Sequence, residues 1–384
     1  MDLCNHASLK SWINPNHYLT PFSRLAMVQT ELRQATPRSL GYSMPAEWMP
    51  HRATWLSWPH NRETWPTQLE TVQEVWLQMI QALTPHEQVA LLVNDEQTQQ
   101  DVSARLKSAG AAMTNISILK IPSMDVWMRD YGPTFLIRAD SENPLAFNDW
   151  IFNGWGRKYK SYEEDDRIAE DIASFLKVPV FKHAVVLEGG SIEVNGAGTC
   201  LVTEQCLLNR NRNPDMSREE IEQFLKDALS ISHLIWLGEG IIGDDTDGHI
   251  DDIARFINPT TIVCVLEANP NDENYAPLRE NYERLQGAQD QDGKKISVVT
   301  LPCPAPVAYE GARLPASYAN FYIANEVVIV PLFDDSNDRK ALGILQELFP
   351  DRRVTGLPCR TVVAGLGAIH CVTQQEPSIL ACRP

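Results

Sequence analysis

Strand-like apolar runs alternate with amphipathic helical patterns along nearly the whole chain beyond residue 40. Strands interleaved with helices in this way indicate an α/β protein. No sequence repeat, low-complexity tract or linker divides the alternation, so we expect a single domain over residues 41–384. The strand-like runs are Val89–Asn94, Ile116–Ile121, Val185–Leu187, Thr199–Thr203, Leu234–Leu237, Thr261–Leu266, Ser297–Leu301 and Glu326–Leu332.

Three helices are predicted between these runs. The clearest begins at Ser217, because Glu220 three residues later completes the sequence pattern of a capping box. Each helix carries apolar residues at helical spacing, which predicts one buried face. The stripes are Ile221, Phe224, Leu225 and Ala228; Ile168, Ile172, Phe175 and Leu176; and, after Asp338, Ala341, Leu345, Leu348 and Phe349.

The charge balance of the chain excludes several classes of partner. Its 33 Lys and Arg against 50 Asp and Glu give a formal net charge of −17. Nucleic acids and anionic lipid surfaces require basic protein surface, so we expect neither as a partner. No apolar run approaches the roughly 18 residues of a membrane span. An acidic surface instead favours small cationic ligands.

The eight cysteines and the N-terminus bear on location. The cysteines are scattered without a C-x-x-C pair, which is typical of reduced, mostly inert thiols in a large chain. The N-terminus lacks the basic start and apolar stretch of a secretory signal. We therefore expect a cytoplasmic protein. Residues 1–40 are polar with no sustained period, and we expect a poorly ordered N-terminal extension.

Two segments carry functional groups next to chain-breaking residues. Trp127 to Pro133 contains Arg129 and Asp130 and ends in Gly-Pro, which predicts a strand end or loop. In the second segment Glu188 precedes two glycines, so the backbone there can approach another group closely. Considered alone, each segment is equally consistent with an ordinary turn.

Five aspartates and a histidine are crowded into residues 243–252. Such like charges repel each other, so the crowding indicates a bound cation or cationic ligand. Aligning Gly248 with the invariant glycine of a calcium-binding EF-hand puts Gly243 and Ala254 where carboxylates are required, which excludes that site. A zinc site would need a second His or a Cys at helical spacing, and none is near in the sequence. On a strand, His249 and Asp251 would share a face.

Cys371 follows the glycine-containing segment Ala364 to His370. A dinucleotide-binding loop is excluded, because a third glycine, a following helix and an early βαβ unit are missing. A cysteine with a distant His and Asp is a recognised arrangement for a nucleophile. Additional carboxylates fit a substrate whose reacting group is a cation, since guanidinium pairs bidentately with carboxylates.

The chain resembles the agmatine deiminases of the guanidino-group-modifying superfamily, which also resemble peptidylarginine deiminases. The matching stretches run from about residue 41 to 377 and are specific in combination. They are Met44 to Trp48, Trp58-Pro59, Trp127 to Pro133, Asn153 to Gly156, Leu187 to Ile192, Gly198 to Glu204, Asn209 to Pro214, Gly243 to Asp252, Tyr318 to Asn325 and Ile369 to Gln375. Leu366 and Ala368 interrupt a glycine run that is richer in many relatives.

This resemblance implies a five-bladed, pseudo-fivefold α/β propeller (pentein) with the active site on its axis. It implies hydrolysis of agmatine to N-carbamoylputrescine and ammonia in putrescine biosynthesis, through an amidino-cysteine intermediate and without metal or organic cofactor. A homodimer is expected by resemblance alone. The implied roles are Cys371 as nucleophile, His249 as general acid and base, Asp130 and Asp251 as guanidinium ligands, Glu188 as the partner of His249, and Trp127, Asp244, Asp245 and Asp247 in the remaining pocket.

Three rival functions remain open at this stage. An arginine or peptidylarginine deiminase would use the same centre and would need a group for the α-carboxylate or peptide, for which Arg129, Arg157 and Arg255 are candidates. A metal-dependent hydrolase could be built on the aspartate-rich segment. A polyamine-binding protein without catalytic activity could use the same scaffold.

Overall fold

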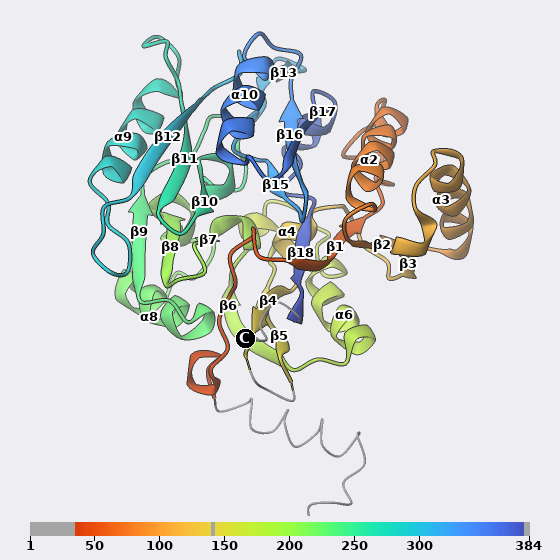
Figure 1. Cartoon of the computed structure of the whole chain (residues 1–384), viewed down its shortest axis with the longest axis horizontal. Coiled ribbons are helices and arrows are strands. Elements are labelled where there is room, and N and C mark those ends of the chain that lie inside the picture. The colour runs from red at the N-terminus through yellow and green to blue at the C-terminus, as the bar shows by residue number, and fades with distance from the viewer. Residues whose placement is uncertain (1–34, 140–142, 380–384) are drawn as a thin grey trace, which may run out of the picture.

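The computed structural model describes residues 35–139 and 143–379. Within these residues the backbone forms five sheets of three or four strands that surround a common centre as blades (Figure 1). A separate hairpin, β13 (Ala308–Tyr309) with β14 (Ala312–Arg313), lies outside the blades. The expectation of a five-bladed α/β propeller is confirmed.

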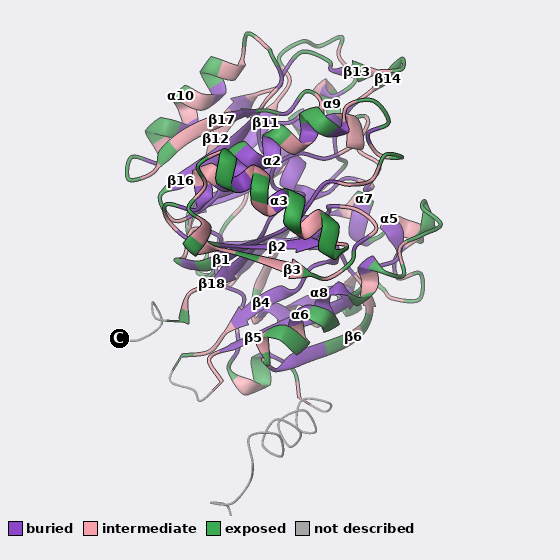
Figure 2. Ribbon diagram, turned by 90° about the vertical axis from the view of Figure 1, so that its right-hand side faces the viewer, coloured by how far each residue is buried: buried purple, intermediate pink, exposed green. Residues whose placement is uncertain are grey.

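Every blade repeats one topology. Its innermost strand is antiparallel to the middle strand, and the middle strand is parallel to the next strand outward. Parallel neighbours need a crossover connection, and in each blade a helix supplies it. The middle strands of the blades are mostly buried, whereas exposed residues gather on outer helices such as α3 and α10 (Figure 2).

The blades follow the chain in order. The first contains β1 (His51–Ser57), α2 (Leu69–Leu83), β2 (Gln88–Val93), α3 (Glu96–Ser108), β3 (Ile116–Lys120) and, as its innermost strand, β18 (Gln374–Pro377). The second contains α4 (Met128–Tyr131), β4 (Thr134–Ile137), β5 (Leu145–Ile151), α5 (Gly154–Arg157), α6 (Ile168–Leu176) and β6 (Val180–Val186). The third contains β7 (Glu193–Val194), β8 (Thr199–Thr203), α7 (Glu204–Leu207), α8 (Arg218–Leu229) and β9 (His233–Leu237).

The fourth blade contains β10 (Ala254–Asn258), β11 (Thr261–Leu266), α9 (Tyr275–Gln286) and β12 (Ser297–Pro302). The fifth contains β15 (Tyr322–Ile323), β16 (Val327–Leu332), α10 (Asp338–Leu348) and β17 (Arg353–Pro358). The last strand, β18, pairs with the first, β1, so the two ends of the propeller share one sheet. This pairing closes the ring of blades.

The predicted elements are present in this architecture, but the long helices α2, α3 and α9 were not among the predicted helices. All three expected helices are present as α6, α8 and α10, and α8 has the capping box, with Ser217 accepting from the Glu220 backbone N–H. Seven strand-like runs coincide with strands. The run Val185–Leu187 covers only the end of β6, because its earlier residues Lys182 and His183 are polar and hide the strand.

The N-terminal segment is described only in part. Residues 1–34 of the expected extension lie outside the described residues. Residues 38–40 form a 3₁₀ turn, and the Arg38 guanidinium donates to the Ile231 carbonyl at 3.1 Å. No helix in the described part of the chain is long and apolar enough to cross a membrane.

Candidate active site

The candidate residues occupy equivalent places in four of the five blades, in the short segments that lead into the innermost strands. Asp130 lies in α4 before β4, and Glu188 precedes the 3₁₀ turn Gly189–Ser191 before β7. His249 and Asp251 lie at the 3₁₀ turn Ile250–Asp252 before β10. Cys371 lies just before β18. The topology therefore brings residues far apart in the sequence to one centre.

Two predictions about local structure are corrected here. The segment from Trp127 to Pro133 is a single helical turn rather than a strand end, since Met128–Tyr131 form α4. His249 and Asp251 do not lie on a strand. Their backbone forms the start of a 3₁₀ turn, and both side chains are still buried at the centre. Such one-turn segments are too short to show a helical period.

Asp130 is held by two donors. The indole N–H of Trp155 donates to its Oδ2 at 2.9 Å, and the Gly190 backbone N–H donates to its Oδ1 at 3.0 Å. Burial raises the pKa of Asp130 to about 6, against the lowering effect of His249. A cation beside this carboxylate would therefore shift it strongly towards the ionised form.

His249 lies between two carboxylates. Its Nδ1 is 3.7 Å from Asp130 Oδ1, and its Nε2 is 3.8 Å from Glu188 Oε2. Burial alone lowers the pKa of His249, but Asp130 and contacts with Cys206 and Glu188 outweigh it and raise the pKa well above its ordinary value. Glu188 is ionised, because the Arg212 guanidinium donates to its Oε1 at 2.7 Å and, despite burial, lowers its pKa.

Gly190 is required for this close arrangement. A Cβ at this position would lie 2.5 Å from His249 Nδ1 and 2.8 Å from Asp130 Oδ1, which is shorter than any real contact of this kind. The sequence-based interpretation that the two glycines permit close backbone approach is confirmed. Gly189 makes the same kind of approach to the Arg129 carbonyl, 2.1 Å from such a Cβ.

Asp251 is bound by the residue that precedes the cysteine. His370 Nδ1 lies 2.7 Å from Asp251 Oδ2, and its Nε2 lies 2.7 Å from Glu47 Oε2. The His370 ring therefore bridges Asp251 and Glu47 through its two nitrogens. Burial raises the pKa of Asp251, but the His370 contact outweighs it and lowers that pKa below its ordinary value.

Glu47 connects His370 to two buried arginines. Its carboxylate also lies 2.8 Å from Arg255 Nη2 and 3.3 Å from Arg129 Nη2, and it accepts from the Ile323 backbone N–H. Arg129 and Arg255 are themselves buried. These ion pairs occupy two of the arginines considered for a substrate carboxylate, and neither of them lines the cavity described below.

Cys371 is buried, with 6% of its surface exposed. The Asn320 amide donates to its Sγ at 3.1 Å, and the thiol lies 3.8 Å from Asp251 Oδ2. Burial, followed by the charges of Asp251, Asp252 and Asp130, raises the pKa of Cys371 well above its ordinary value. The thiol is therefore protonated until a positive charge enters.

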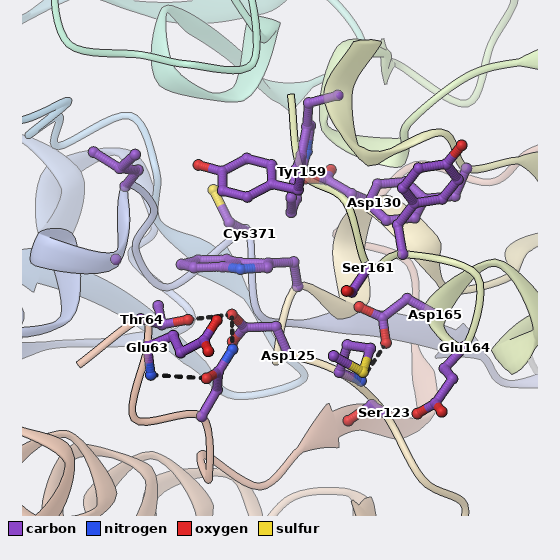
Figure 3. Close-up of a pocket in the computed structure, with 18 of the residues that line it drawn as sticks. Glu63, Thr64, Ser123, Asp125, Asp130, Tyr159, Ser161, Glu164, Asp165 and Cys371 are labelled. Atoms are coloured by element: carbon purple, nitrogen blue, oxygen red, sulfur yellow. Dashed lines mark hydrogen bonds between the residues drawn. The ribbon is translucent and has the colours of Figure 1, made fainter. Parts of the chain in front are cut away.

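A cavity of about 740 Å³ opens beside Cys371 and Asp130. In Figure 3 these two residues and Tyr159 lie together at one side, and Asp125, Glu164 and Asp165 lie at the other. Trp127 also lines the cavity, and its ring packs edge-on against Trp155. Gly367 is needed beside it, since a Cβ there would lie 2.3 Å from the indole.

The three candidate acids of the aspartate-rich segment lie in different surroundings. Asp245 lines the cavity and accepts from the Tyr159 hydroxyl. Asp244 instead accepts from backbone N–H groups of Thr246, Gly248 and His249, and so holds the loop. Asp247 is neutralised by Arg212 and Lys158, at 2.7 Å each. Of the three, the described cavity is lined by Asp245 alone.

Several residues of the site were not assigned a role from the sequence. The contacts described above involve Glu47, Trp155, Tyr159, Arg212, Asn320 and His370. Five of them, Glu47, Trp155, Arg212, Asn320 and His370, lie within stretches that carry the family resemblance. That position was the available signal, but their partners are distant in the sequence and cannot be read from spacing.

Comparison with known proteins matches this arrangement to one family. The model of the Porphyromonas-type peptidyl-arginine deiminase family matches residues 43–377. An agmatine deiminase of Ectopseudomonas mendocina is 38% identical over 89% of this chain and 97% of its own. The solved agmatine deiminase of Enterococcus faecalis is 35% identical, with a TM-score of 0.83 over 90% of this chain and 98% of that one.

A further solved structure, an agmatine deiminase of C. jejuni with substrate bound, is 30% identical with a TM-score of 0.79 over 88% of this chain and 96% of that one. These matches cover the five blades and the segments that converge at their centre. The resemblance expected from the sequence is confirmed. The chain belongs to the Porphyromonas-type peptidyl-arginine deiminase family.

Proposed function

We propose that this protein is an agmatine deiminase, which hydrolyses agmatine to N-carbamoylputrescine and ammonia. One observation carries the proposal: Cys371 and Asp130 line one cavity, with Asp251 3.8 Å from the thiol and His249 3.7 Å from Asp130. A cluster of acids around a thiol suits a cationic electrophile. The names of the relatives support agmatine as that electrophile.

Asp130 and Asp251 bind the guanidinium in this proposal. Asp251 Oδ1 is buried without a hydrogen-bond partner among the described residues, so a donor from the substrate would satisfy it. Asp130 faces the cavity with its orientation fixed by Trp155 and Gly190. Guanidinium has five N–H donors in a plane and can bond both carboxylates while its carbon faces the sulfur.

Substrate binding also activates the nucleophile. The surrounding carboxylates hold the Cys371 thiol in its protonated form, and the guanidinium charge offsets them and lowers the thiol pKa. The thiol proton passes to solvent, the thiolate attacks the guanidinium carbon, and a C–S bond forms. The site therefore generates its nucleophile only when a cation is bound.

His249 moves the protons. As an imidazolium it protonates the departing nitrogen, the C–N bond breaks, and ammonia leaves an amidino-cysteine. The neutral ring then takes a proton from water, which adds to the amidino carbon. Collapse of this adduct breaks the C–S bond and releases the ureido product. Glu188 keeps the ring oriented and favours its charged form.

The amine end of agmatine extends into the cavity. Asp245 is its proposed ion-pair partner, exchanging its contact with Tyr159 for the ammonium. The aromatic faces of Trp127, Trp155 and Tyr159 add cation–π attraction of about 0.5–2 kcal/mol. Arginine carries a carboxylate at this end, which Asp245 would repel.

The test is ammonia release by the purified protein from agmatine, arginine and a peptidyl-arginine in parallel. Turnover of agmatine alone is expected. Turnover of arginine or the peptide instead would keep the catalytic centre and overturn the substrate assignment. Thiol alkylation should inactivate the enzyme and chelators should not; the opposite pattern would favour the metal-dependent hydrolase. Agmatine binding without ammonia release would favour a non-catalytic polyamine-binding protein.

We also propose that residues 41–384 act as one catalytic domain in the cytoplasm and that the product enters putrescine biosynthesis. The pairing of β18 with β1 supports the single domain. The six cysteines in the described residues are free, which supports a reducing compartment. A homodimer is expected by resemblance, and sedimentation of the purified protein tests it.

A further inference from the structure

A thiol that the proposed reaction does not use lies beside His249. Cys206 is fully buried in α7, where its backbone N–H donates to Thr203 Oγ1 at 3.3 Å. Its Sγ, a carboxylate oxygen of Glu188 and a ring nitrogen of His249 all lie within 4.8 Å of one another. Sequence spacing could not have found this group, because the three residues come from separate segments of the third and fourth blades.

The group presents electron pairs that no protein donor uses. The Arg212 guanidinium donates to Glu188 Oε1, but Glu188 Oε2 has no hydrogen-bond partner among the described residues. The same is true of both ring nitrogens of His249. Buried polar atoms without partners are costly, so Glu188 Oε2 and the His249 ring nitrogen beside the Cys206 thiol indicate room for a ligand that accepts electron pairs.

We propose that Glu188, Cys206 and His249 form an inhibitory site for a borderline-soft divalent metal ion of the Zn²⁺ class. Sulfur, imidazole nitrogen and carboxylate oxygen are the ligands that zinc prefers, and three of them leave a fourth position for water. On binding, the Cys206 thiol and the His249 imidazolium each release a proton to solvent, and the metal takes the electron pairs that this frees on sulfur and on the ring nitrogen. The inhibition rests on the proposed function, since it removes the acid and base of that reaction.

The spacing suits such an ion. Bonds of about 2.3 Å to sulfur and about 2.0–2.2 Å to nitrogen or oxygen bring the ligand atoms of one ion within roughly 4 Å of each other. Ligand atoms within 4.8 Å reach this with small side-chain movements. The three residues do not line the described cavity, but Asp130 does and lies 3.7 Å from His249, so a metal ion would enter past Asp130.

A second group, Asp251, Asp252 and Cys371, has similar spacing, but each of its residues already has a hydrogen-bond partner, and its one unpartnered atom, Asp251 Oδ1, is the proposed guanidinium ligand. His370 bonds Asp251 Oδ2, and the Asn320 amide donates both to Asp252 Oδ1 and to Cys371 Sγ. A metal ion there would have to displace these bonds. The unpartnered atoms therefore favour the site at Cys206.

Binding of Co²⁺ to the full-length protein tests the assignment without any enzyme assay. A thiolate bound to Co²⁺ gives a charge-transfer band in the near ultraviolet. We expect this band in the wild type and in Cys371→Ser, and its loss in Cys206→Ser and in His249→Asn, with near-ultraviolet circular dichroism as the check on folding. A band that persists without Cys206, a band that disappears with Cys371, or no band in the wild type would overturn the proposal.

Zn²⁺ inhibition of ammonia release then tests the consequence. We expect half-inhibition at a Zn²⁺ concentration at least ten-fold higher in Cys206→Ser than in the wild type, with chelator restoring wild-type activity. An unchanged concentration would overturn the regulatory role. If the wild type did not turn over agmatine, the proposed function would fail, and the cobalt measurement would still decide the metal site.

Discussion

Cys371 differs from the other buried thiols in what surrounds it. Cys264 lies in β11 among apolar residues, and burial raises its pKa to about 12 with no ionised group as a cause. Cys371 faces three carboxylates and borders the cavity. Cys371→Ser should reduce ammonia release below a thousandth of wild type, because the serine hydroxyl is a far weaker nucleophile here. Cys264→Ser is the control, and comparable losses in both variants would refute the assignment.

We expect His370 to affect substrate binding through its bond to Asp251. His370→Gln removes a ring bonded to two carboxylates and leaves Asp251 Oδ2 without that partner. A hydrogen bond to a charged group contributes about 1.5–3 kcal/mol, so kcat/KM should fall roughly ten- to hundred-fold. The loss should appear mainly in KM, since Asp251 binds the guanidinium. Steady-state kinetics decide this, and an unchanged KM with a lower melting temperature would leave His370 a structural residue only.

The buried carboxyl of Asp149, in β5, should make the stability of the protein depend on pH. Burial raises its pKa to about 6, from about 3.9 in an unfolded chain. Between these values the folded state binds more protons than the unfolded state, so the free energy of unfolding falls as pH rises. Above pH 6 the penalty is complete. Asp149→Asn should therefore stabilise the protein at pH 8, by at most about 3 kcal/mol, and much less at pH 4; urea unfolding at both pH values measures it.

At the scale of elements, the site is built from single turns that lead into the innermost strands. Gly190→Ala tests how tightly two of them are packed, because the added methyl would meet His249 and Asp130. Activity should fall at least hundred-fold. Gly343→Ala is a matched control within α10, where nothing lies within 4 Å of an added Cβ. That change should leave activity intact and stabilise the helix by about 0.5–1 kcal/mol. Equal activity of the two variants would contradict the described packing.

The same elements mark the limit of what the sequence could predict. The predicted strands are mainly middle and outer strands, whose apolar runs are continuous, and the innermost strands were missed. β7 and β15 have two residues each, and β18 is Gln-Gln-Glu-Pro. β7 begins with the buried Glu193, which pairs with Arg255 from β10. Because these strands are short or carry charges paired across blades, neither alternation nor composition indicates them.

At the scale of the whole molecule, fivefold symmetry exists in the backbone without a repeat in the sequence. Each blade keeps the same strand order but fills its central position with a different group: Asp130, Glu188, His249, Asn320 or Cys371. A site that needs a nucleophile, acids and a proton carrier excludes identical repeats at its centre. The candidate residues could thus be picked out by motif, whereas their partners required the folded chain.

The pairing of β18 with β1 closes the ring of blades and should contribute to stability. Glu376 in β18 is fully buried, accepts from the Trp55 indole at 2.9 Å and pairs with Arg52, so it joins the last strand to β1. Glu376→Gln removes the charge that both donors face and should lower the free energy of unfolding by about 2 kcal/mol. Glu283→Gln, in an exposed ion pair with Arg279, should change it negligibly. Because β18 follows closely on Cys371, weaker pairing of β18 also loosens the segment that carries the thiol. Heating should therefore abolish ammonia release by Glu376→Gln at a lower temperature than in the wild type. Equal urea midpoints for the two variants would mean that closure of the ring contributes little to holding the site.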